Sequence, residues 1–236
     1  MNGDLASVID LVEGIKAGQA GNAQLVVCPS AVFLMKVGEM LDGTNISLGA
    51  QNVCDQASGA YTGEISASML KECGCRYVIV GHSERRAIYL ESDQLVARRF
   101  AMAVESGLIP ILCVGESLQE RQQGATEAVV GRQLDAVIDS QGISAITHCV
   151  IAYEPVWAIG TGQVATPDQA QAVHRFIREK LAARDSVAAE TVQILYGGSM
   201  NPANASGLLS QHDIDGGLIG GAALKAADFL EIAQSV

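Results

Sequence analysis

Short, continuous runs of apolar residues alternate along the chain with longer stretches in which apolar residues recur at helical spacing. The short runs are apolar throughout, which is typical of parallel strands covered on both faces. They predict strands at residues 25–28, 46–49, 77–80, 109–114, 149–153, 192–196 and 217–219. The longer stretches predict helices at 4–17, 30–41, 65–73, 93–106, 117–141 and 167–183, from Pro202, and from Ala226.

This pattern contains eight principal helices but seven strands. In a chain of right-handed βα units each helix follows its own strand, and here the first helix has none. We therefore expect an α/β fold, a (β/α)8 barrel in one domain over residues 1–236, with strand one missing and the N-terminus truncated. A doubly wound open sheet also alternates strands with helices, but it usually has six strands. We further expect Gly124 and Gly131 to divide the 117–141 helix in two.

Reactive side chains follow several of the predicted strands, at the end where βα barrels carry their functional residues. The carboxylate of Glu154 follows one strand and precedes Pro155 and a loop with Trp157, so the loop could cover it and make it a base. His82 follows another strand and could be a core histidine, but Glu154 at a second strand end favours chemistry. The full set is Asn52, His82, Glu84, Glu116, Glu154 and Ser199.

Two glycine pairs suggest where an anion could bind. Gly197-Gly198 and Gly220-Gly221 directly follow strands that are seventh and eighth in barrel counting. Backbone N–H groups can come close together there, and a short helix near Ala222 could present its N-terminus. This end of a barrel commonly binds phosphate. The alternative is that each pair forms a tight turn that needs a positive φ.

Composition argues against several other classes of protein. A net charge of −11 disfavours nucleic acid and anionic membrane surfaces as partners. No apolar run reaches the roughly 18 residues of a membrane span, and Asp4, Asp10 and Glu13 do not suit a signal peptide, so we expect a cytoplasmic protein. Six cysteines without a paired Cys-x-x-Cys framework predict reduced, mostly buried thiols.

The remaining motifs favour chemistry without a cofactor. A Schiff-base mechanism needs a lysine inside the barrel, but all five lysines fall on predicted helices or their edges. The histidines and carboxylates show no metal-binding spacing. The segment 160–165 matches a dinucleotide fingerprint only in part and follows a loop rather than a strand. We therefore expect no metal and no cofactor. The lysines are Lys16, Lys36, Lys71, Lys180 and Lys225.

The sequence Tyr-Glu-Pro-Val-Trp-Ala-Ile-Gly-Thr-Gly at 153–162, with Val-Gly-His-Ser-Glu-Arg-Arg at 80–86, resembles the triosephosphate isomerase family. Residues 51–52, 59–64, 113–116, 196–199 and 220–222 match further family motifs in the same order, so the resemblance covers essentially the whole chain. It implies interconversion of dihydroxyacetone phosphate and D-glyceraldehyde 3-phosphate through an enediolate. The family's opening strand ends in Gly-Asn-Trp-Lys, and we expect this chain to lack its asparagine and catalytic lysine.

The resemblance also implies roles for individual residues, because this family is itself a standard example of tuned acid and base chemistry. Glu154 would move the proton between two carbons, and His82 would polarise the carbonyl as a neutral imidazole. The backbone amides that would hold phosphate belong to Gly160, Ser199, Gly220 and Gly221. The lid that would exclude water consists of Pro155, Val156, Trp157, Ala158, Ile159, Gly160 and Thr161.

Two further implications concern assembly and the missing lysine. The loop 59–64 resembles the family's dimer arm, with Thr62 reaching a neighbouring subunit, so a homodimer is expected. Glu84 would lack the lysine with which the family pairs it. Losing one electrostatic stabiliser costs about 100- to 1,000-fold in turnover, so this exact chain could be inactive. The alternatives are an inactive phosphate-binding relative and another sugar-phosphate isomerase or epimerase on the same barrel.

Overall fold

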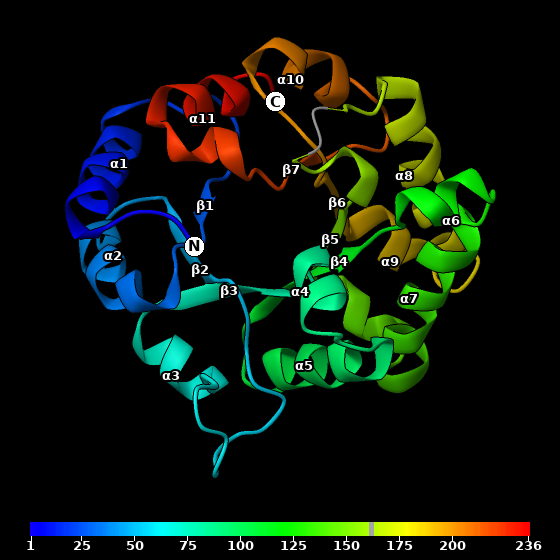
Figure 1. Cartoon of the computed structure of the whole chain (residues 1–236), viewed down its shortest axis with the longest axis horizontal. Helices are drawn as coiled ribbons and strands as arrows, with labels where there is room; N and C mark the ends of the chain where they lie inside the picture. Colours follow the sequence, from blue (N-terminus) through cyan, green and yellow to red (C-terminus); the bar gives the residue numbers. More distant parts are fainter. Residues whose placement is uncertain (161–162) are drawn as a thin grey trace.

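The computed structural model describes residues 1–160 and 163–236. Its described strands form one parallel sheet in which each strand pairs with the next along the chain, as predicted. The sheet curls around a central axis, and β1 and β7 are its two end strands (Figure 1). The strands are β1 (Val26–Val27), β2 (Ser47–Ala50), β3 (Cys75–Val80), β4 (Ile109–Val114), β5 (Val150–Tyr153), β6 (Gln193–Tyr196) and β7 (Gly216–Gly217).

Helices surround the outside of the curled sheet (Figure 1). They are α1 (Leu5–Ala17), α2 (Leu34–Leu41), α3 (Ala67–Glu72), α4 (Ser83–Ile88), α5 (Asp93–Glu105), α6 (Leu118–Gln122), α7 (Thr126–Gln141), α8 (Pro167–Ala182), α9 (Ser186–Thr191), α10 (Pro202–Leu209) and α11 (Ala226–Ala233). Short 3-10 helices are η1 (Ala31–Phe33), η2 (Ile143–His148), η3 (Val156–Ala158) and η4 (Gly221–Leu224). The alternation of strands and helices defines an α/β barrel fold and confirms the predicted class.

The helical region 117–141 was predicted to be divided by Gly124 and Gly131, and the structure bears out one of these two glycines. It does divide at Gly124, whose φ of +70° ends α6. The expectation that Gly131 also interrupts the region was wrong, because Gly131 lies buried within α7. An added Cβ there would make only ordinary contacts with Lys180 and Phe176, so the packing of α7 does not require a glycine at this position.

Polar caps fix the start of several helices. Ser117 accepts from the backbone N–H of Glu120 and that glutamate accepts from the N–H of Ser117, which forms a capping box at α6. Thr166 and Gln169 form the same motif at α8, where Pro167 occupies the first helical position. These caps place each helix start directly after the loop that leaves a strand.

The core has two layers separated by the sheet. Side chains from alternate positions of β3, β4 and β5, including Tyr77, Ile111 and Val150, fill the inside of the curl. The intervening side chains, such as Val78 and Leu112, pack outward against the helices in the larger cluster. All six cysteines are free, and most are buried within these layers, as expected from their apolar surroundings.

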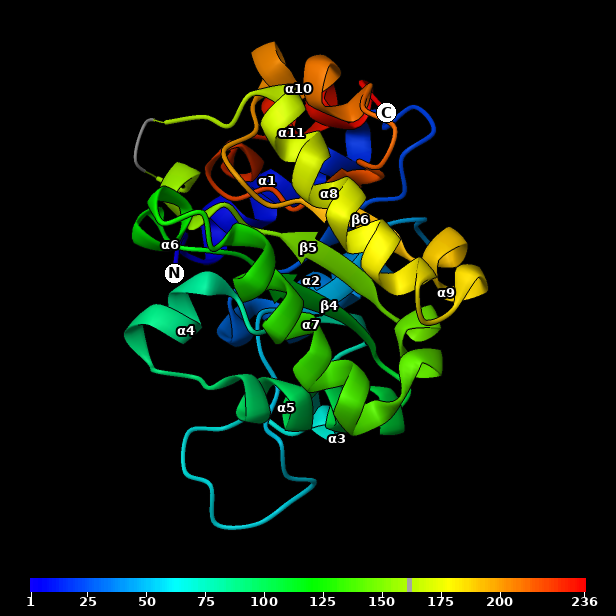
Figure 2. The same ribbon diagram turned by 90° about the vertical axis from the view of Figure 1, so that its right-hand side faces the viewer.

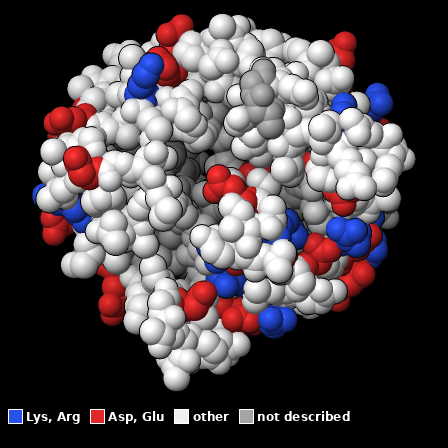
Figure 3. Space-filling model, viewed as in Figure 1, with Lys and Arg blue, Asp and Glu red and all other residues white. Residues whose placement is uncertain are grey.

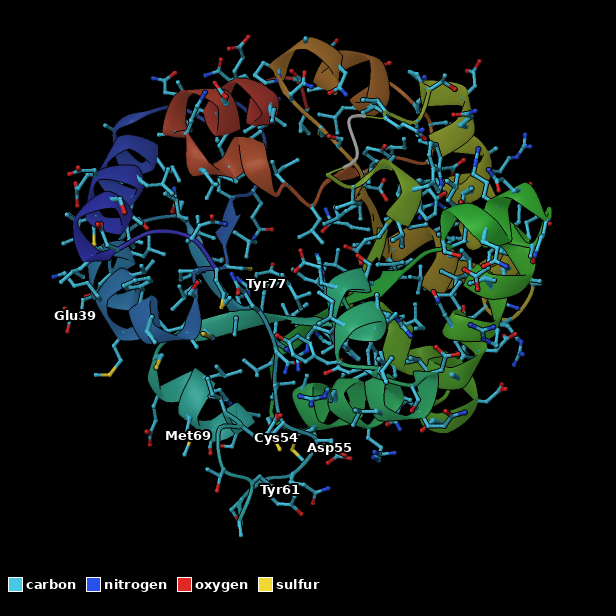
Figure 4. The ribbon with its side chains drawn as sticks, viewed as in Figure 1. Glu39, Cys54, Asp55, Tyr61, Met69 and Tyr77 are labelled. Carbon is cyan, nitrogen blue, oxygen red and sulfur yellow. The ribbon has the colours of Figure 1, made fainter. Side chains whose placement is uncertain are left out.

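The loop 51–66 projects away from the body of the molecule (Figure 2). Tyr61 lies near its tip, whereas Cys54 and Asp55 lie at its base (Figure 4). Two ion pairs fasten this base to α5, since Arg98 lies 2.8 Å from Asp55 and Arg99 lies 3.1 Å from Glu64. In the part of the chain that the structure describes, no helix is both long and apolar enough to cross a membrane.

Candidate active site

Two residues from different strand ends meet at the carboxyl end of the sheet. Glu154 directly follows β5 and is 1% exposed, and His82 follows β3 at the N-cap of α4. Nε2 of His82 lies 2.9 Å from Oε1 of Glu154. The parallel register brings these strand ends to one side of the sheet, although 71 positions separate Glu154 from Ser83, the residue after His82.

The backbone of α4 determines which nitrogen of His82 carries the proton. The N–H of Glu84 donates to Nδ1 at 3.2 Å, so Nδ1 acts as an acceptor. A neutral imidazole that accepts at one nitrogen has its proton on the other. Nε2–H of the neutral ring therefore points at Glu154, in the position of a proton donor.

The charge of the partner carboxylates affects the pKa of His82. Burial of the ring lowers this pKa, but the hydrogen bond with Glu154 and the charges of Glu154 and Glu84 raise it more. The net result is a pKa above the ordinary value of 6.5 while the carboxylate stays against the ring. The N–H of Glu84 favours the neutral form, because it needs an acceptor at Nδ1.

Ser83 holds the same carboxylate from a second direction. Its backbone N–H donates to Oε2 of Glu154 at 2.8 Å, and its hydroxyl donates to Oε1 at 3.3 Å. The sequence did not mark Ser83 as a site residue, and its only local signal was its place next to His82 in the 80–86 motif. Glu154 is thus fixed in one orientation by donors from the start of α4.

Glycines make room for the chain around Glu154. An added Cβ at Gly115 would lie 1.8 Å from the backbone oxygen of Glu154, and one at Gly197 would lie 2.9 Å from its Cγ. At Gly198 a Cβ would lie 2.2 Å from Oη of Tyr196. These contacts leave no room for a Cβ, so Gly115 and Gly197 allow the ends of β4 and β6 to approach Glu154.

The predicted lid begins directly after Glu154 and is fastened by a buried carboxylate. Glu116, which is 0% exposed, accepts from Nε1 of Trp157 at 2.9 Å and from Oη of Tyr153 at 3.1 Å. Nη1 of Arg121 lies 3.2 Å from the same carboxylate, and the guanidinium lies 4.4 Å from the centre of the Trp157 ring. The sequence placed Glu116 at a strand end but did not reveal this contact with the lid.

The remaining lid residues fall into two groups. Pro155 and Ala158 are buried beside Trp157, whereas Val156 and Ile159 are half-buried. Gly160 is exposed with a φ of +67°, and Thr161 lies outside the described residues.

The residues expected to hold phosphate lie on three loops at this end of the sheet. The N–H of Ser199 donates to the carbonyl of Ala158 at 3.1 Å, so the lid occupies this amide in the described conformation. Gly220 and Gly221 are exposed, and a Cβ at either would meet open space. None of Gly197, Gly198, Gly220 and Gly221 has a positive φ, so the tight-turn alternative was wrong for both pairs.

Two supporting residues lie further from the acid–base pair. The side chain of Glu84 is 71% exposed, with Oε2 3.9 Å from Nδ1 of His82. Thr62 is exposed on the projecting loop 51–66. Near the middle of the face viewed in Figure 3, the surface is hollowed and bordered mainly by uncharged atoms. The described residues include no group of three or more metal-binding side chains.

A curled parallel sheet with a buried glutamate and a histidine in contact at its strand ends defines the class, an α/β-barrel protein of the kind that builds catalytic sites there. The family model for triosephosphate isomerase matches residues 1–236. The chain therefore belongs to the triosephosphate isomerase family.

Individual relatives match the whole of this chain and most of their own length. The triosephosphate isomerase of Cupriavidus necator is 55% identical over 235 residues, which cover 100% of this chain and 96% of the relative. That of Hydrogenovibrio crunogenus is 56% identical over 238 residues, covering 100% of this chain and 94% of the relative. The protein of that name from Thiobacillus denitrificans is 54% identical, with the same two coverages.

Proposed function

We propose that this chain interconverts dihydroxyacetone phosphate and D-glyceraldehyde 3-phosphate through an enediolate. The observation that carries the proposal is the 2.9 Å contact between Nε2 of His82 and Oε1 of Glu154. This contact supports the proposal because a carboxylate base and a proton donor that lie so close could act on two adjacent atoms of one small substrate. Family membership supplies the identity of that substrate.

In the forward direction Glu154 removes a proton from C1 of dihydroxyacetone phosphate. The electron pair of that C–H bond forms the C1–C2 double bond, and the negative charge develops on the C2 oxygen. Nε2–H of His82 stabilises this oxygen and supplies its proton. Glu154 then returns its proton to C2, and the C1 hydroxyl gives its proton to Nε2 of His82, which leaves the aldehyde and restores the neutral ring. The steps move only protons and need no cofactor.

The described contacts of Glu154 imply that its carboxylate moves during turnover. Its oxygens are bound to Ser83 and His82, so reaching a substrate carbon requires giving up at least one of these hydrogen bonds. His82 would then lose the neighbouring charge that raises its pKa, while the N–H of Glu84 would still require an acceptor at Nδ1. Substrate binding would thereby favour the neutral imidazole that the reaction needs.

The phosphate would bind to the amides of Gly160, Ser199, Gly220 and Gly221. Open space beside the last two glycines supports this assignment. Because the lid carbonyl of Ala158 now accepts from the N–H of Ser199, phosphate could take that amide only if the lid shifted. Phosphate binding and lid movement over Pro155–Thr161 would therefore be coupled, and the closed lid would exclude water from the enediolate.

We also propose that the chain acts as a homodimer in the cytoplasm, with the loop 51–66 as the arm between subunits. The arm is held to α5 by ion pairs at its base, and Tyr61 at its tip is 48% exposed. Thr62 would reach the neighbouring site. Light scattering after size-exclusion chromatography should give twice the 24.6 kDa mass of the chain, and a mass of one chain would contradict this assembly.

Turnover of triose phosphates by the purified chain tests the function. The assay would supply dihydroxyacetone phosphate and, separately, a ketopentose phosphate, and would follow formation of each aldose. We expect turnover of the triose phosphate alone. Turnover of the pentose phosphate would support the alternative sugar-phosphate isomerase, and phosphate binding without turnover of either would support an inactive relative.

A further inference from the structure

A second cleft lies at the opposite end of the strands from Glu154. It has a volume of about 530 Å³, within the usual range for small-ligand sites. Its walls include Ile109, Val150 and Gln193, the first residues of β4, β5 and β6. In Figure 2, α9, which ends beside this cleft at Thr191, lies at the other end of the molecule from α4 and α6.

An aromatic ring and apolar side chains form the inner part of this cleft. Tyr77 is 7% exposed and lies on β3 within the curl of the sheet (Figure 4). It belongs to the inner core cluster with Val150, and Ile109 packs against that cluster. The described hydrogen bonds include none made by the hydroxyl of Tyr77. A flat apolar ligand would find an aromatic surface and an available phenol here.

The cleft lacks acidic lining residues in the described part of the chain, and one unpaired cation, Arg76, lies next to its Tyr77. The guanidinium of Arg76 lies 5.7 Å from the centre of the Tyr77 ring and has no ion pair or hydrogen bond within the described part of the chain. His148 lines the cleft, and Nζ of Lys71 binds the carbonyl of Ser106 beside it. None of the described lining residues is aspartate or glutamate, although the chain has a net charge of −11.

We propose that this cleft binds a small aromatic carboxylate. The ring would lie against Tyr77 between Ile109 and Val150, and the carboxylate would face Arg76 and His148. A guanidinium without a partner beside an aromatic floor suits such a ligand, because it can bind the carboxylate while the ring removes apolar surface from water. The site is independent of the proposed catalysis, since it lies at the other end of the strands.

Titration with benzoate, followed by the ring-proton NMR signals of His148, tests this proposal. Benzoate should shift these signals saturably, and benzyl alcohol, its neutral counterpart, should bind about ten-fold more weakly because it lacks the charge-assisted contact. Inorganic phosphate, which should occupy the other end of the barrel, should not displace benzoate. Equal affinity for the two probes, displacement by phosphate, or no saturable shift at about 20 mM would overturn the proposal.

Matched variants locate the site. Arg76→Gln should weaken benzoate binding about ten-fold, and Gln193→Trp, on an exposed position at the rim, should block it. Arg175→Gln is the control. It removes an arginine of α8 whose side chain is 65% exposed, and it should leave benzoate binding unchanged. Unchanged thermal unfolding would show that each variant is folded. Binding that survives both cleft substitutions would contradict the assignment.

Discussion

Nε2 of His82 lies 2.9 Å from Oε1 of Glu154 and is the nitrogen that carries the proton in the neutral ring. The helix that starts at Ser83 determines both the tautomer of His82 and the orientation of the Glu154 carboxylate. It supplies the N–H that occupies Nδ1 of His82 and the N–H that binds Glu154. The tautomer of His82 is therefore set before any substrate arrives, whereas Glu154 must leave part of this contact to reach a substrate carbon.

The pKa of His82 should depend on Glu154. In the unliganded chain it should lie above 6.5, and in Glu154→Gln it should fall, because the hydrogen bond to a charged carboxylate and its Coulombic attraction are removed. A raised pKa in the folded state stabilises the fold fully below pH 6.5, and this contribution is lost as pH rises through the folded pKa. NMR titration of the ring protons measures the shift, and an equal pKa in both proteins would contradict the pairing.

Glu116 should both hold the lid residue Trp157 in place and contribute to the free energy of unfolding. Replacing it by Gln removes a buried acceptor from Trp157 and Tyr153 and the charge facing Arg121, so the fold should lose about 1–3 kcal/mol. Trp157 is the only tryptophan of the chain, so the tryptophan fluorescence of the protein reports on the surroundings of this one ring. Urea unfolding gives the free energy, and Glu179→Gln, on an exposed position of α8, is the comparison. A spectrum and stability equal to the parent would show that Glu116 does not hold the lid.

His174 should make the fold sensitive to acid. Burial lowers its pKa from 6.5 to about 4, and Nε2 has no partner in the described chain, so the folded state resists protonation. Between pH 6.5 and 4 the unfolded chain binds more protons at this site, and stability should fall as pH falls, by at most about 3 kcal/mol.

The comparison of His174→Asn with His212→Asn measures this contribution. His212 has a side chain that is 92% exposed and serves as the control. Unfolding in urea at several pH values between 4 and 7 should give a shallower slope for His174→Asn than for the parent, whatever its absolute stability. The same slope in the two variants would exclude His174 as the source.

The electrostatics of the site lead to a prediction about turnover. Lys16, Lys36, Lys71 and Lys180 lie on helices and Lys225 at a helix cap, so the described site lacks the lysine that the resemblance implies. Adding a segment that ends in Gly-Asn-Trp-Lys before Met1 should raise kcat by about 100- to 1,000-fold, because a cation would stabilise the enediolate. The same segment with methionine in place of the lysine is the control. Equal kcat with both segments would contradict the electrostatic role.

Much of the fold could be predicted because each strand is covered on both faces. Residues 109–114 were apolar at every position, and β4 has the same bounds. The strand predicted at 217–219 instead occupies Gly216–Gly217, because glycines carry little apolar signal. α4 and α9 were not predicted as separate helices, since each has only six residues and no sustained apolar period.

The site could be predicted only in part, for a related reason. Position at a strand end identified His82 and Glu154, because parallel strands bring their carboxyl ends to one side of the sheet. The contact of Ser83 with Glu154 spans 71 positions, and that of Trp157 with Glu116 spans 41. Hydrogen bonds over such separations depend on the orientation of side chains in the folded state and leave no periodic signal in the sequence.

Deuterium incorporation from D2O into dihydroxyacetone phosphate tests proton transfer by Glu154 directly. If Glu154 removes a carbon-bound proton that can exchange with solvent, NMR should show deuterium at C1 of the ketone and at C2 of the product. Glu154→Asp and His82→Ala should slow this exchange about 100- to 10,000-fold with little change in KM, whereas the exposed Glu179→Gln should not. No exchange with the parent chain, or the same rate in Glu154→Asp, would contradict proton transfer by this residue.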